Sequence, residues 1–132
     1  MNVVGSTIGR ETDAGIYLHA GPEIGVASTK AFTAQVMVFS MLSILIGYKK
    51  GRMNKQQYEN HVKSLSQIPA QIAHILNNTS RVLEASKVYR YAQHMFFFGR
   101  GFNFPVALEG ALKLKEISCI HAEGYAAAEL KH

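Results

Sequence analysis

The chain has 132 residues, of which 48% are hydrophobic and 17% charged, a composition typical of one globular domain and not of a disordered chain. Its net charge of +5 comes from scattered Lys and Arg residues, so composition does not favour nucleic-acid binding. The single cysteine, Cys119, cannot form an internal disulfide, and its apolar neighbours favour a buried, unreactive thiol in a reducing compartment.

The N-terminal part predicts two short strands, at residues 2–4 and 16–19, each followed by a Gly-containing turn. It lacks the basic-then-apolar pattern of a secretory signal. Ser28 and Thr29 precede a long helical pattern, where they can cap the helix or, together with the backbone amides, bind a hydroxyl or an anion.

Three helices are predicted in the middle of the chain. The first, at residues 30–48, is apolar on most sides, which indicates burial between layers or against another subunit. Its most apolar run, 36–46, is shorter than the roughly 20 residues that a bilayer requires, so we expect a soluble, cytoplasmic protein without membrane contact. The second helix, at 53–76, contains Pro69, which predicts a kink or a split. The third runs from Thr79 or Ser80 to Gln93.

A new pattern begins near residue 95. The four apolar residues 95–98 predict a buried parallel strand, Gly99–Arg100–Gly101 a turn, and Pro105 the first turn of another helix. This layout brings backbone N–H groups to the carboxyl end of a sheet, where ligands bind, although tight-turn geometry explains the glycines equally well. Three short strands separated by long helices indicate parts of two α/β units.

The last predicted helix carries the main candidate site. Glu109, Lys113 and Glu116 are spaced i, i+4 and i+7, which places them on one face. They form either a solvated ladder of ion pairs or a charged stripe directed at a ligand; their apolar neighbours leave both interpretations open. Further acids and bases follow at His121, Glu123, Glu129 and His132, in a spacing that fits acid–base chemistry and no known metal motif.

Two segments give a resemblance to a known family. GRGFNFPVALEGALKLKEISCIHAEGYAAAELKH resembles the start of the second sugar-isomerase (SIS) subdomain of the glutamine–fructose-6-phosphate aminotransferases, and GSTIGRETDAGIYLHAGPEIGVASTKAFTAQ resembles the end of the first. The resemblance implies an α/β fold: a partial, helix-rich three-layer SIS-type arrangement with a Rossmann-like parallel sheet. It divides the chain into the end of the first subdomain at 1–50, a helical connector with the first helix of the second subdomain at 51–93, and the start of the second subdomain at 94–132.

The resemblance also implies a chemistry. The family makes glucosamine 6-phosphate from fructose 6-phosphate and glutamine-derived ammonia, without a cofactor or metal, as a homodimer. Glu116 is then the base that moves a proton between C1 and C2, Lys113 assists near the sugar oxygens, and Glu109 orients part of the site. His132 corresponds to the histidine that helps to open the sugar ring from the neighbouring subunit. Val26, Ala27 and Ser28 correspond to the loop that contacts the sugar.

Several family features are not found in the 132 residues. They are the glutaminase domain, the Ser/Thr-rich phosphate loop and the lysine that reacts with the open-chain sugar. Ala128 and Cys119 replace the Gly and Tyr that are common in the family, and Ala128 would be strained if that position needs a positive φ. We therefore expect the isolated chain to be inactive. The alternatives are a non-catalytic sugar-phosphate-binding SIS remnant and another SIS isomerase or deglycase.

Overall fold

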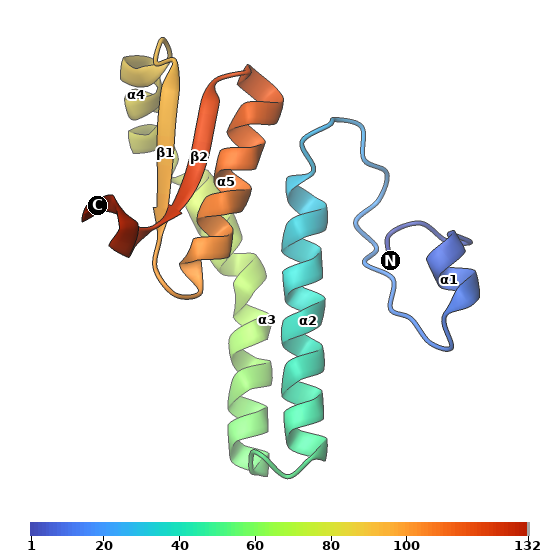
Figure 1. Ribbon diagram of the computed structural model, residues 1–132. Coiled ribbons are helices and arrows are strands. Elements are labelled where there is room, and N and C mark those ends of the chain that lie inside the picture. The colour runs from blue at the N-terminus through green and yellow to red at the C-terminus, as the bar shows by residue number, and fades with distance from the viewer. Residues whose placement is uncertain (132) are drawn as a thin grey trace. The chain divides into compact units, whose positions relative to one another are not determined.

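The computed structural model describes residues 1–131, whose helices and strands are drawn in Figure 1, and the chain divides into two compact units. The first unit comprises Met1–Pro22 and Lys30–Leu83, and the second comprises Glu23–Thr29 and the chain from Glu84 onward. The elements in chain order are α1 (Thr7–Glu11), α2 (Thr29–Lys49), α3 (Lys55–Asn77), α4 (Ser80–Tyr89), β1 (His94–Gly99), α5 (Asn103–Ser118), β2 (His121–Ala126) and the 3-10 helix η1 (Ala127–Lys131).

In the first unit, α2 confirms the predicted helix at 30–48 and ends in a glycine turn. Gly51 has a φ of +66°, its N–H donates to the carbonyl of Tyr48 at 3.0 Å, and the N–H of Arg52 donates to Gly47 at 2.9 Å. These two bonds form a Schellman motif, which a Gly at the left-handed position permits without strain. The motif stops α2 and lets the chain reverse into α3.

Helix α3 begins with a reciprocal cap. The side chain of Asn54 accepts from the N–H of Gln57, and the side chain of Gln57 accepts from the N–H of Asn54, both at 2.9 Å. Stacked rings of Tyr48 and Tyr58, with centroids 4.5 Å apart, join the adjacent ends of α2 and α3. The helix continues through Pro69, so the predicted split is wrong.

The membrane argument drawn from the short apolar run needs a correction. Helix α2 has 21 residues and a mean hydropathy of 1.7 in its most apolar window, which is long and apolar enough to cross a membrane by length and composition. A core helix of a soluble protein passes the same test, so this property alone assigns no location.

The two strands predicted near the N-terminus do not form. Residues 2–4 form no strand and lead through a bend and a turn into α1, and residues 16–19 have no regular structure. One residue of parallel pairing remains, because Met1 N donates to Ile16 O and Leu18 N donates to Met1 O, both at 2.8 Å. A β-strand needs a neighbouring strand to satisfy its backbone hydrogen bonds. Within the described chain, residues 16–18 find such bonds only with Met1, so no strand forms there.

The second unit contains a parallel β1–α5–β2 crossover. The strands pair in register from His94 opposite His121 to Gly99 opposite Ala126. Helix α5 covers one face of this two-stranded sheet through small residues. Its Ala107 and Ala111 and the Ala122 of β2 are the buried hydrophobic residues of the described chain.

The other face of the sheet is open in the described chain. Phe96 and Phe98 point to this face and are 53% and 41% exposed, so the expectation of a buried strand at 95–98 is wrong. The strand itself and its parallel pairing are as predicted. Strand β2 was not predicted at all, and α4 ends at Tyr89, before the expected Gln93.

Two further expectations concern single residues. Cys119 is exposed and follows the end of α5 in the left-handed conformation, with a φ of +58°, so the prediction of a buried thiol is wrong. Ala128 lies in η1 and is not among the residues with positive φ, so the strain considered for it does not arise.

Candidate active site

The turn before α5 places this helix close against the end of β1. A Cβ atom on Gly99 would lie 2.1 Å from the carbonyl oxygen of Asn103, so only glycine fits there. Gly101 has a φ of +55°, and its carbonyl accepts from Phe104 N at 3.1 Å. The close approach explains Gly99, the positive φ explains Gly101, and the turn brings the first turn of α5 to the carboxyl end of the strand.

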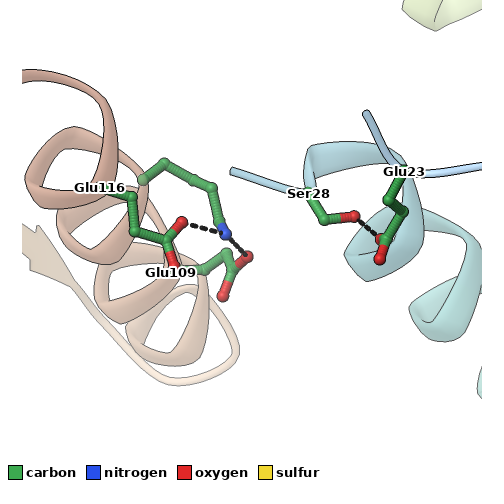
Figure 2. Close-up of polar contacts among 5 residues, drawn as sticks. Glu23, Ser28, Glu109 and Glu116 are labelled. Atoms are coloured by element: carbon green, nitrogen blue, oxygen red, sulfur yellow. Dashed lines mark hydrogen bonds and ion pairs between the residues drawn. The ribbon is translucent and has the colours of Figure 1, made fainter. Parts of the chain in front are cut away.

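Glu109, Lys113 and Glu116 converge as predicted. The Nζ atom of Lys113 lies 2.8 Å from Oε2 of Glu116 and 3.4 Å from Oε1 of Glu109 (Figure 2). The three side chains are 22%, 18% and 25% exposed in chain order. The ion pair between Lys55 and Glu59 on α3, by comparison, is 79% and 54% exposed. The α5 cluster is therefore much better shielded than a solvated ladder.

The cluster holds Lys113 in its charged form. Its pKa is raised above the ordinary value, first because of the hydrogen bond to Glu116. Partial burial opposes the shift, and attraction to Glu109 and Glu116 adds to it. An ammonium between two carboxylates can stabilise negative charge that develops on a neighbouring substrate oxygen, while Glu116 can accept a proton.

The predicted sugar loop belongs to the same compact unit as α5. Val26 and Ala27 lie in the loop Glu23–Thr29, whose last residue is also the first of α2, and the hydroxyl of Ser28 donates to Oε1 of Glu23 (Figure 2). His132 lies outside the described residues. Of the predicted site, the structure thus joins the three α5 residues directly and assigns the three loop residues to the same unit.

A second polar cluster lies on the open face of the sheet. Nδ1 of His94 is 3.3 Å from Nδ1 of His121, Nε2 of His121 is 3.3 Å from Oε1 of Glu123, and the hydroxyl of Tyr125 donates to Oε2 of Glu123. Sequence reasoning named His121 and Glu123 and missed the other two. Polar side chains at every second position, 121, 123 and 125, were the available signal of a strand with one polar face.

In this second cluster, the pKa values of Glu123 and Tyr125 are shifted from their ordinary values. The hydrogen bond from Tyr125 is the main cause that lowers the pKa of Glu123, and His121 and Lys115 lower it further against partial burial. The same bond raises the pKa of Tyr125. Among the residues that the structure describes, no group of three or more His, Cys, Asp or Glu side chains is arranged to hold a metal ion.

Comparison with known proteins shows which family this chain belongs to. The sequence model of the SIS domain matches residues 1–45 and 89–132, which make up most of the chain. The chain belongs to the SIS domain family. The unmatched residues of this SIS chain include the whole of α3.

Individual SIS relatives are similar over nearly the whole chain. The glutamine–fructose-6-phosphate aminotransferases (isomerizing) of Bacteroides thetaiotaomicron and Chlorobaculum tepidum are 53% and 54% identical over 99% of this chain. The C-terminal domain of glucosamine-fructose-6-phosphate aminotransferase from Francisella tularensis matches with a TM-score of 0.95 and 42% identity, over 99% of this chain and 37% of that one. The chain spans about a fifth of the curated relatives' length, 21% in both bacterial cases.

Proposed function

We propose that this chain is part of the isomerase domain of a glutamine–fructose-6-phosphate aminotransferase. The names of the relatives supply the substrates, fructose 6-phosphate and glutamine. The single observation that carries the chemistry is the shielded Lys113 ammonium 2.8 Å from the Glu116 carboxylate. A carboxylate beside a fixed cation suits proton transfer between two carbons of a sugar phosphate.

The proposed mechanism gives each residue a separate task. Glu116 moves a proton between C1 and C2 of the sugar, and Lys113 stabilises the charge that develops on the sugar oxygens. Glu109 holds the ammonium of Lys113 from the other side. Val26, Ala27 and Ser28 contact the sugar, and His132 opens its ring from the neighbouring subunit.

The proposal also covers the oligomeric state of the parent enzyme and the subdomain boundaries within this chain. The parent enzyme is a cytoplasmic homodimer that binds neither nucleic acid nor membranes, and it needs no cofactor for this step. The end of the first SIS subdomain lies at 1–50, the helical connector and first helix of the second at 51–93, and the start of the second subdomain at 94–132. The inactivity expected of the isolated chain stays a prediction.

A chimera tests the proposal. The 132 residues replace the matching segment of the Bacteroides thetaiotaomicron relative, and glucosamine 6-phosphate formation is measured with fructose 6-phosphate and glutamine. We expect turnover, and we expect Glu116→Gln to reduce kcat by about 10²–10⁴-fold, since a positioned general base contributes that much. Glu59→Gln is the matched control, because Glu59 pairs with Lys55 in the same way on a solvated face. A chimera without turnover, or equal activity of the two variants, contradicts the proposal.

A further inference from the structure

The loop Glu23–Thr29 is closed by two side-chain hydrogen bonds. The chain leaves the first unit after Pro22 and re-enters it at Lys30, and Nζ of Lys30 donates to the carbonyl of Pro22 at 2.5 Å. One step further into the loop, Ser28 donates its hydroxyl hydrogen to Glu23 (Figure 2). The two bonds join position 22 to 30 and position 23 to 28 across the loop.

Hydrogen bonds hold the chain at the base of the loop, whereas apolar side chains at its tip are exposed. The side chain of Asn2 accepts from Ala20 N at 3.1 Å and donates to Gly21 O at 2.9 Å, which fixes the chain just before the loop. At the tip, Ile24 and Val26 are 97% and 85% exposed. Apolar packing therefore does not hold these two side chains, whereas the bond between Glu23 and Ser28 links the two ends of the tip.

The bond also fixes what Ser28 can offer to a ligand. A hydroxyl has one hydrogen to donate and two lone pairs that accept. Because the hydrogen of Ser28 is engaged by the Glu23 carboxylate, the oxygen is left as an acceptor. An acceptor oxygen of this kind can receive a hydrogen bond from a hydroxyl group.

We propose that Glu23 is a positioning residue that turns Ser28 into a hydrogen-bond acceptor for a hydroxyl group of the sugar. This inference rests on the proposed function and adds a residue to it. Glu23 acts through Ser28 and does not touch the substrate itself.

The test uses variants of the same chimera. Glu23→Ala frees the Ser28 hydroxyl, and we expect the KM for fructose 6-phosphate to rise about tenfold, the loss that a charged hydrogen bond commonly gives, with little change in kcat. Glu23→Gln keeps an acceptor oxygen for Ser28, so it should stay near the unmutated KM. Ser28→Ala and the double variant Glu23→Ala/Ser28→Ala should have equal KM values, because Glu23 has no effect without the hydroxyl.

The opposite outcomes overturn the inference. They are an unchanged KM in Glu23→Ala, a Gln variant as impaired as the Ala variant, or effects of Glu23 and Ser28 that multiply. If the unmutated chimera has no turnover, the proposed function fails, and the positioning role is read from ¹⁵N relaxation of Val26 and Ala27 in the 132-residue chain. Greater fast mobility in Glu23→Ala than in Glu23→Gln supports the role, and equal mobility rejects it.

Discussion

At the scale of single residues, the main charged cluster of the candidate site is centred on Lys113. Lys113 contacts two carboxylates, and its raised pKa keeps the ammonium protonated throughout the neutral range. Because the folded-state pKa lies above the ordinary 10.5, the stabilisation from this contact is complete below that value and disappears as the pH rises through the folded-state pKa. The proposed base Glu116 therefore has a cation beside it at every pH at which the enzyme would work.

The bond between Glu123 and Tyr125 predicts a pH dependence at both extremes. The pKa of Glu123 is lowered, so its stabilisation is present above the ordinary 4.5 and is lost as the pH falls through the folded-state pKa. The pKa of Tyr125 is raised, so its stabilisation is present below 10.0 and is lost as the pH rises through the folded-state pKa. We expect Glu123→Gln to move one tyrosine ionisation to lower pH in an ultraviolet absorbance titration. Glu59→Gln should not, and identical titrations of the two variants would count against the bond.

At the scale of elements, the contacts of α5 with β1 and β2 depend on glycines, because a side chain at these positions would not fit. A Cβ atom on Gly124 would lie 2.9 Å from Cα and Cδ2 of Leu108, and one on Gly110 would lie 3.1 Å from the ring of Phe97. The helix therefore lies close to the sheet, and no space remains between them for an additional methyl group at these glycines.

This close packing predicts the effect of one added methyl group. Gly124→Ala should lower the free energy of unfolding by about 1–3 kcal/mol, the usual cost of overpacking, in urea titrations of the chimera. Gly25→Ala is the control, because a Cβ atom there meets nothing within 4 Å and Gly25 has no positive φ. Equal unfolding midpoints for the two variants would show that α5 can move away from the sheet.

The elements also show what sequence patterns can and cannot predict. The apolar stripe predicted α2, and the i, i+4, i+7 spacing predicted the Lys113 cluster, because both depend on residues within one helix. Strand β2 was missed because small and polar residues alternate in it, and the strand at 16–19 was wrong because its partner is too short. The contact of His94 with His121 depends on the register of two strands, which no local pattern contains.

At the scale of the whole molecule, large apolar surfaces lack cover within the described residues. Phe39, Met41 and Ile46 of α2 are 66%, 54% and 50% exposed, and the helix is apolar on most sides. An apolar groove of about 510 Å³ runs between α2 and α3. Apolar area of this kind is usually an interaction surface or a cause of aggregation.

The uncovered surface predicts that the 132-residue chain self-associates. We expect its weight-average sedimentation coefficient to rise with concentration in sedimentation velocity runs. The double variant Phe39→Gln/Ile46→Gln should weaken this dependence, since it removes apolar area from α2. Val4→Gln, at a position that is 80% exposed outside the helix, should leave it unchanged. A monomer at all concentrations would be contrary to this expectation.

The loop Glu23–Thr29 has a consequence for synthesis on the ribosome. The chain on both sides of it belongs to the first unit, whereas the rest of its own unit begins at Glu84. Translation is vectorial, so the loop emerges before α2 and α3 and must wait for β1, α5 and β2 to be made. The second unit can therefore be completed only after its last strand has left the ribosome, and no single cut in the chain separates the two units.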